Sequence, residues 1–187
     1  MNLDRAIDLV KGERVRQREQ WGNQHDNVRP VTFWGPLLTK HAGLLFDMWD
    51  GQEPGVSQLV ARLTKIAAIA VAGSEAIDRV HIWPTVYSRF DSDDVEAQAA
   101  HTVDVCAEVM VEQTRQDTKF GWKRNMDKYN WMCVLGEEIG EVCEAGHEIV
   151  ESRVEFREGM TKLVKELVQV AAVAVNMAEH ISRGDRQ

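Results

Sequence analysis

The sequence predicts an all-α protein. Apolar residues recur at spacings of three and four along six separate stretches of the chain. No stretch shows a sustained alternation of apolar and polar residues between Gly or Asn turn pairs, the pattern typical of β-hairpins. The 187 residues are 44% apolar and 28% charged, as in ordinary globular proteins. These observations predict a helical bundle formed by one compact domain or two small ones.

The first half of the chain contains three of the expected helices. In 2–20, charged and apolar residues alternate at helical spacing. A polar break precedes the helix expected over 33–49, which Trp34 heads, and the segment DGQEPG separates that helix from an Ala- and Val-rich one over 57–80. The continuous apolar character of this last stretch predicts a helix buried in the core.

The second half repeats this pattern with helices expected over 94–116, 129–150 and 160–182. Ser92, Asp93 or Asp94 is the expected N-cap of the first of them. The breaks between helices carry turn residues or dense polar runs, and they fall at 22–30, 50–55, 84–94, 121–128 and 151–159.

Charge and composition exclude several classes of protein. The chain has 22 Lys and Arg against 30 Asp and Glu, and 91–187 alone holds 11 against 20, so nucleic-acid binding is not expected. No apolar run is judged long enough to span a membrane, and the N-terminus lacks a signal-peptide core, which predicts a cytoplasmic protein without a membrane partner. The three cysteines have no CxxC or Cys/His spacing, so neither disulfides nor a zinc site is expected, and we expect buried thiols.

An internal repeat organises the chain. The segment 59–77 aligns without gaps with 163–181, with identical residues at 9 of 19 positions. Upstream, 13–22 aligns with 112–121 in the same order along the chain. Three agreeing blocks, the third headed by a Trp in each copy, favour a duplicated three-helix unit over a chance likeness of two core helices.

The predicted organisation is therefore a first copy over 1–83, a linker over 84–94 and a second copy over 95–187. The two copies are expected to pack about a pseudo-twofold axis around one shared core, because a unit of about 80 residues buries little surface alone. Such a chain is either a monomeric pseudo-dimer or a homodimer of pseudo-dimers. Trp34 and Trp131, which occupy equivalent places in the repeat, are expected to be core anchors rather than platforms for a base.

The second copy carries an acidic pattern that suggests a metal site. Glu138 and Glu141 share one face of a helix, and Glu166, Gln169 and Asn176 share one face of the next. Antiparallel packing of these helices would bring the carboxylates together, where they repel one another unless a proton or a divalent cation offsets their charge. Oxygen ligands favour Mg²⁺ or Mn²⁺ over zinc. The alternative interpretation is a solvated helix face.

These residues resemble a known family. The pattern Glu137-Glu138-x-x-Glu141 followed by Glu166-x-x-Gln169 is similar to the EExxE and ExxD motifs of the all-α nucleoside triphosphate pyrophosphohydrolases, which include MazG and the dimeric dUTPases. The lead-in ERxRQ…WG resembles the phage and actinobacterial MazG-like branch. The likeness covers 107–183, with a degenerate copy over 8–80. Gln169 departs from the Asp of the wider family.

The resemblance implies hydrolysis of a nucleoside triphosphate to the monophosphate and pyrophosphate, in control or housecleaning of a nucleotide pool. It implies Mg²⁺, or Mn²⁺, held by the side chains Glu138, Glu141, Glu166 and Gln169. Glu137 and Glu138 are the expected catalytic residues, with Glu137 orienting or deprotonating the attacking water. The expected substrate-binding residues are Asn176, Lys123, Arg124 and Lys128. For the three cations the alternative is a solvated basic loop, and for the protein it is a non-catalytic nucleotide-binding or interaction protein on the same fold.

In the first copy, basic or apolar residues replace the acidic pattern. The residues aligned with Glu137, Glu138, Glu141, Glu166, Gln169 and Asn176 are Lys40, His41, Leu44, Arg62, Lys65 and Ala72. This reversed site cannot hold a divalent cation. Its cations are expected either to pair with the surplus acids of the second copy or to bind phosphates, and we favour ion pairing.

Overall fold

The computed structural model describes residues 1–22, 26–51, 54–79, 95–120 and 126–184. Within these ranges it contains six α-helices, one short 3-10 helix and no strand, so the predicted all-α class is confirmed. The elements are α1 (Leu3–Trp21), η1 (Val31–Phe33), α3 (Trp34–Gly51), α4 (Val56–Ile77), α6 (Val95–Phe120), α7 (Lys128–Val150) and α8 (Phe156–Ser182).

The helix ends follow local capping. The Asp127 side chain accepts a hydrogen bond from the Asn130 backbone N–H and begins α7, and Glu155 caps α8 in the same way. Because Glu155 is the cap, α8 begins four residues before the expected 160. The expected linker 84–94, with its candidate caps Ser92, Asp93 and Asp94, lies outside the described residues.

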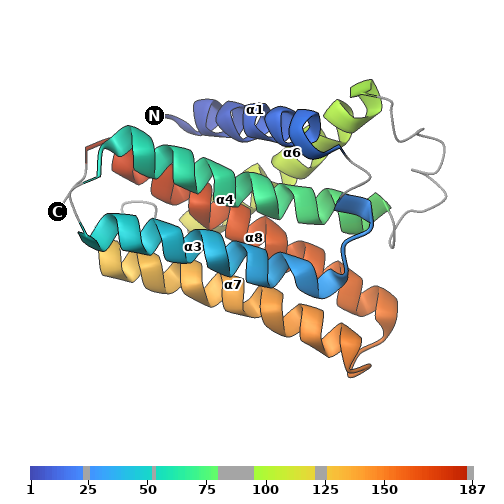
Figure 1. The fold of residues 1–187 in the computed structure, drawn as a ribbon. Helices are drawn as coiled ribbons and strands as arrows, with labels where there is room; N and C mark the ends of the chain where they lie inside the picture. Colours follow the sequence, from blue (N-terminus) through green and yellow to red (C-terminus); the bar gives the residue numbers. More distant parts are fainter. Residues whose placement is uncertain (23–25, 52–53, 80–94, 121–125, 185–187) are drawn as a thin grey trace.

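The helices form two layers of three (Figure 1). In one layer α4 lies between α1 and α3, and in the other α8 lies between α6 and α7. The layers meet along α4 and α8, with α3 packed on α7 and α1 on α6. The two central helices therefore have neighbours on most sides, which explains why their sequences are apolar almost all round.

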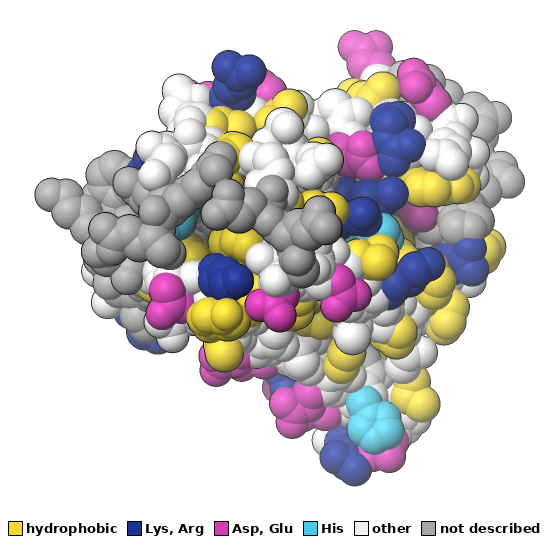
Figure 2. Space-filling view, turned by 60° about the vertical axis from the view of Figure 1, so that its left-hand side comes forward, with side chains coloured by type: hydrophobic (Ala, Val, Ile, Leu, Met, Phe, Trp, Pro, Cys, Tyr) yellow, Lys and Arg dark blue, Asp and Glu magenta, His cyan; other side chains and the backbone are white. Residues whose placement is uncertain are grey.

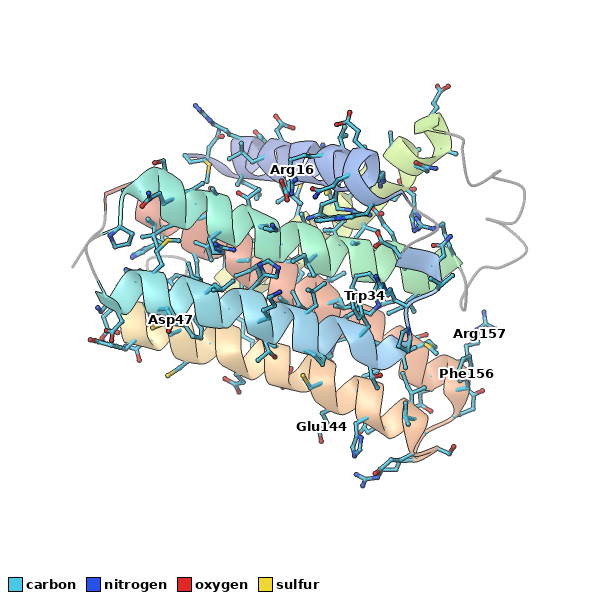
Figure 3. All side chains as sticks on the ribbon, in the orientation of Figure 1. Arg16, Trp34, Asp47, Glu144, Phe156 and Arg157 are labelled. Carbon is cyan, nitrogen blue, oxygen red and sulfur yellow. The ribbon has the colours of Figure 1, made fainter. Side chains whose placement is uncertain are left out.

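Close packing of small residues lets the central helices approach each other. A Cβ atom at Gly73 in α4 would lie 2.9 Å from the Trp34 ring and 3.0 Å from Leu167 in α8. Figure 3 shows Trp34 between α3 and α4, and it is buried, as is Trp131 in α7, so their prediction as core side chains is confirmed. Buried apolar side chains from all six helices form one cluster.

The prediction that no apolar run is long enough to cross a membrane is wrong for α4. By length and composition alone this helix could span a bilayer, and no other described helix could. About half of its most apolar window, 56%, is buried inside the protein. A central helix of a bundle needs the same apolar composition as a membrane span, because neighbouring helices surround it.

The cysteines also differ in part from expectation. Cys106 in α6 is buried, and burial raises the pKa of its thiol to about 11. Cys133 and Cys143 are exposed on α7, so the prediction of buried thiols is wrong for both. The reason is the place of α7 at the edge of its layer, where its main neighbours among the described elements are α3, α8 and η1.

Candidate functional site

Three carboxylates from two helices meet at one place. Glu138 and Glu141 lie one turn apart on α7, and Glu166 comes from α8, which runs antiparallel to α7 (Figure 1). One oxygen of each side chain lies within 4.8 Å of the others. Two opposite Mg–O bonds span about 4.2 Å, so small side-chain movements would let these oxygens share one ion. The three residues therefore form a group that could hold a metal ion.

The electrostatics of this acidic cluster, Glu138, Glu141 and Glu166, show the cost of assembling it. Burial, and then the charges of Glu141 and Glu166, raise the pKa of Glu138 to about 7. Burial also raises the pKa of Glu166, against the opposing effect of Lys165, whose Nζ lies 3.5 Å from its carboxylate. A proton or a cation would relieve this repulsion.

Gln169 links the acids of the cluster. Its amide nitrogen donates a hydrogen bond of 3.2 Å to Glu138 and a second one to Glu166. The side chain is buried, one turn beyond Glu166 on α8. In this orientation the amide presents its nitrogen to the carboxylates, so ligation of a metal through its oxygen requires rotation of the amide group.

The cluster opens into a cleft of about 540 Å³ between α6, α7 and α8. The α6 side supplies two cations and an amide, and the α7 side supplies carboxylates. The lining residues are Arg115, Gln116, Lys119, Val134, Glu137, Glu138, Glu141, Gln169 and Val173. This acidic cleft is large enough for part of a nucleotide and places positive charge opposite the acids.

The structure brings some predicted site residues to the cleft and not others. Glu137 is exposed and lines it. Lys128 lies at the end of α3 instead, with its Nζ 3.4 Å from the Trp49 carbonyl oxygen, and it is not among the lining residues. Lys123 and Arg124 lie outside the described residues. Arg115 and Lys119 are the cations that the structure places at the cleft, whereas the sequence indicated the loop after α6.

Asn176 lies beside the cleft and is held by α6. Its side-chain oxygen accepts a 2.5 Å hydrogen bond from the Gln113 amide, and its own amide donates to Gln116 at 3.4 Å. Gln113 is buried and also donates to Glu179 at 2.7 Å. This network fixes the position of Gln116 at the cleft wall. Sequence reasoning missed it, although the repeat alignment contained a signal, since Glu179 is one of the identical residues.

The counterpart in the first half is a buried ion-pair network. Glu75, aligned with Glu179, is fully buried and binds Arg14 of α1 at 2.7 Å and Arg18 at 2.9 Å. Thr102 of α6 donates to the same carboxylate at 2.6 Å. Although burial opposes ionisation, Arg14 and Arg18 lower the pKa of Glu75 to about 2. The network ties α1, α4 and α6 together and was not predicted from the sequence.

The structure also brings residues of the reversed site in the first copy together. His41 on α3 lies against Arg62 on α4, with 3.4 Å between His41 Nδ1 and Arg62 Nη1. Within the described part of the chain, no carboxylate oxygen lies within 4.0 Å of the charged nitrogens of Lys40, Arg62 or Lys65. The favoured prediction that these cations pair with the acids of the second copy is therefore wrong. The reversed site lies on α3 and α4 and the acidic pattern on α7 and α8, which belong to different layers.

A scan against protein-family models matched nothing, and neither did searches of curated proteins and of solved structures. The functional assignment therefore depends on the geometry of the two sites.

Proposed function

We propose that this chain is a Mg²⁺-dependent nucleoside triphosphate pyrophosphohydrolase, with its active site in the acidic cleft. The observation that carries the proposal is the meeting of Glu138, Glu141 and Glu166 within 4.8 Å, beside a cleft that also presents Arg115 and Lys119. Acids on one wall and bases on the other suit a substrate that brings both a divalent cation and a chain of phosphates.

The residues of the cluster fit Mg²⁺ because every metal-ligating atom that they offer is an oxygen. In addition, the raised pKa of Glu138 shows that its ionised form is destabilised in the absence of a cation. In the proposed complex Glu138, Glu141, Glu166 and a rotated Gln169 hold the ion, with Mn²⁺ as the substitute. The bound ion supplies positive charge that polarises the phosphate chain and the attacking water.

The other groups of the chain act on the substrate. Arg115 and Lys119 neutralise the outer phosphates, which leave as pyrophosphate. Glu137 reaches the open side of the cleft and orients the water that attacks the α-phosphorus, accepting its proton. Asn176 positions Gln116 through their hydrogen bond. We propose this division of roles in place of phosphate binding by Lys128.

The test is incubation of the protein with a panel of canonical and modified nucleoside triphosphates and Mg²⁺, with detection of pyrophosphate. Activity should fall at least about a hundredfold in Glu138→Gln, because this variant loses a charged ligand. Glu144→Gln is the matched control, since Glu144 is exposed on the same helix and points away from the bundle in Figure 3. Full activity in Glu138→Gln, or none in the wild type with any substrate, would contradict the proposal.

One observation favours the alternative of a nucleotide-binding protein without turnover. The Gln169 amide donates to two of the three acids, so it already neutralises part of their repulsion without a metal. If this arrangement persists with substrate present, nucleotides bind and are not hydrolysed. Calorimetric binding of a nucleotide without pyrophosphate release would identify this case.

We also propose that the fold is a tandem repeat packed about a pseudo-twofold axis, with copies over 1–83 and 95–187. The exchange of α1, α3 and α4 for α6, α7 and α8 leaves the pattern of neighbouring helices unchanged, which supports this. So do matching hydrogen bonds: Arg16 binds Glu13 at 2.6 and 2.7 Å, and Arg115 binds Glu112 at 2.7 Å.

A further inference from the structure

We propose that the first half carries a second ligand site, which binds a free phosphate-type anion: inorganic pyrophosphate or the phosphate chain of a nucleotide. This basic site consists of Lys40 and His41 on α3 and Arg62 and Lys65 on α4. It does not depend on the hydrolysis proposed for the acidic cleft.

The four side chains converge from two neighbouring helices. The contact at the centre is the 3.4 Å approach of Arg62 Nη1 to His41 Nδ1. His41 is buried, with 9% of its surface exposed, while Arg62 and Lys65 are half-buried and Lys40 is exposed. Figure 2 shows that Lys and Arg side chains, in dark blue, reach the surface on the right-hand side of the molecule. The site is therefore reachable by a small ion.

The basic site lacks a counter-ion within the described structure. Helix α1 supplies a carboxylate, that of Glu13, whose charge interacts with both His41 and Lys65. That carboxylate is already bound by Arg16 at 2.6 and 2.7 Å and by Gln17 at 3.2 Å. Its single charge cannot balance Lys40, Arg62 and Lys65 as well as Arg16. Half-buried cations that lack a fixed partner favour a mobile anion.

The state of His41 shows how strong the local positive potential is. Burial, and then the charges of Lys65, Arg62 and Lys40, lower its pKa to about 4, and the charge of Glu13 opposes them only in part. A bound anion would reverse the electrostatic part of this effect. His41 would then take up a proton and donate a further hydrogen bond to the ligand.

The donor set fits an anion with several oxygens. Arg62 offers a planar fork of N–H groups, Lys40 and Lys65 offer ammonium groups, and protonated His41 adds one more donor. Such a set matches the geometry and charge of a phosphate chain better than that of a single carboxylate. A cation-free anion is preferred, because a bound Mg²⁺ would cancel part of the ligand's charge.

The test measures pyrophosphate binding by calorimetry with the full chain in EDTA. Without a divalent cation the acidic cleft repels anions, so the heat reports on the basic site. The double variant Arg62→Ala, Lys65→Ala should bind at least about tenfold more weakly. Arg5→Ala with Arg153→Ala is the matched control, because it removes the same charge at two exposed positions, and it should change affinity by less than about twofold.

A second readout is the NMR titration of the His41 ring, identified through His41→Gln. Saturating pyrophosphate should raise the pKa of His41 by at least about one unit, and the ring signals of exposed His147 should not respond to pyrophosphate. A non-hydrolysable nucleotide analogue separates the two sources: affinity equal to that of pyrophosphate means that only the phosphate chain is recognised, and higher affinity means that the nucleotide is the ligand.

The proposal is overturned if pyrophosphate gives no heat of binding and does not change the pKa of His41. It is also overturned if the control variant loses as much affinity as the double variant, or if Glu138→Gln loses pyrophosphate binding in EDTA. Because the double variant removes repelling charges, its melting temperature should be unchanged or higher. If it fails to fold, Lys65→Gln alone carries the same expectation, with a loss of at least about threefold. Loss of Mg²⁺-dependent hydrolysis would leave these measurements unaffected, so the two proposals fail separately.

Discussion

At the scale of single residues, the acidic cluster is distinguished by its amide. Gln169 donates to Glu138 and to Glu166, so the cluster contains three carboxyl groups and an internal donor instead of four carboxyl groups. This lowers the cost of folding without a metal and lowers the gain when a metal binds. Stability without a cation and affinity for a cation are thus coupled at this one position.

The substitution Gln169→Asp should lower the stability of the metal-free protein and raise its affinity for a divalent cation. Without a metal, the fourth carboxylate adds repulsion and removes two hydrogen bonds, so the melting temperature should fall. Millimolar Mg²⁺ or Mn²⁺ should then raise it by more than in the wild type. Thermal unfolding with EDTA and with metal measures both effects. A variant as stable as the wild type in EDTA, with no larger metal effect, would show that Gln169 is not part of the cluster's charge balance.

The pH dependence of stability isolates Glu138. Its pKa rises from 4.5 unfolded to about 7 folded, so the protonated form is favoured by folding. Its contribution is full below pH 4.5 and is lost as the pH rises to about 7, by at most about 3 kcal/mol before solvent screening. His41, with a folded pKa of about 4, acts in the opposite direction below pH 6.5.

The measurement is therefore a difference: urea unfolding of wild type minus Glu138→Gln, in EDTA, from pH 5 to 8. The wild type should lose stability relative to the variant as the pH rises. An identical pH dependence in both proteins would mean that the carboxyl is solvated, as in the alternative interpretation of the acidic face.

At the scale of helices, α4 and α8 each bury a glutamate, but the partners of the two carboxylates differ. Each buries a Glu at the same place in the repeat alignment, Glu75 in α4 and Glu179 in α8. Glu75 binds the charged and buried Arg14, whereas Glu179 accepts from the neutral Gln113 and pairs at 3.3 Å with Arg183, whose side chain is 38% exposed. A buried charged pair costs more to break than a neutral hydrogen bond or an exposed ion pair, because the remaining partner keeps a buried charge.

Glu75→Ala should therefore destabilise the protein by about 3 to 5 kcal/mol, since buried Arg14 loses its nearest counter-ion and keeps only Asp26, at 3.4 Å. Glu179→Ala should cost only about 1 to 3 kcal/mol, the usual penalty for an unsatisfied neutral donor, because its charged partner Arg183 is exposed enough to be hydrated. Urea unfolding of both variants compares the two. Equal losses would show that the two networks have the same energetic role.

The close approach of the central helices gives a second comparison. Gly73→Ala should destabilise by about 1 to 3 kcal/mol, because its Cβ would meet the Trp34 ring at 2.9 Å. Gly12→Ala on α1, where nothing lies within 4 Å, should stabilise by about 0.5 to 1 kcal/mol. A stabilising effect of Gly73→Ala would mean that α3 and α8 can shift to accommodate the added methyl group without strain.

The sequence predicted the helices better than their contacts. Periodicity located all six, because a helix needs only an apolar stripe and local caps, and the spacing of Glu138, Glu141 and Glu166 indicated their meeting across two helices. It did not predict the Arg14 and Glu75 pair, which looks like ordinary surface charge until α4 and α6 cover it. Nor could it predict the direction of the Gln169 amide, which depends on side-chain geometry.

At the scale of the whole molecule, we propose one fused pseudo-dimer with two sites of opposite charge. The shared core should make each half dependent on the other, because separating the layers would expose the apolar faces of α4 and α8.

Separate expression of 1–90 and 91–187 tests this dependence. We expect each half to be unfolded or self-associated alone, and to regain helicity by circular dichroism when the two are mixed. Two independently stable, monomeric halves would contradict a shared core.

The most direct test of the central claim, that the second half carries a live hydrolase site, follows the oxygen of water. The wild type should convert a nucleoside triphosphate and Mg²⁺ in ¹⁸O-labelled water to a monophosphate that carries the label and to unlabelled pyrophosphate. Glu138→Gln should give neither product, and Arg62→Ala with Lys65→Ala should still give both. Label in pyrophosphate or free phosphate, or undiminished turnover in Glu138→Gln, would contradict the account.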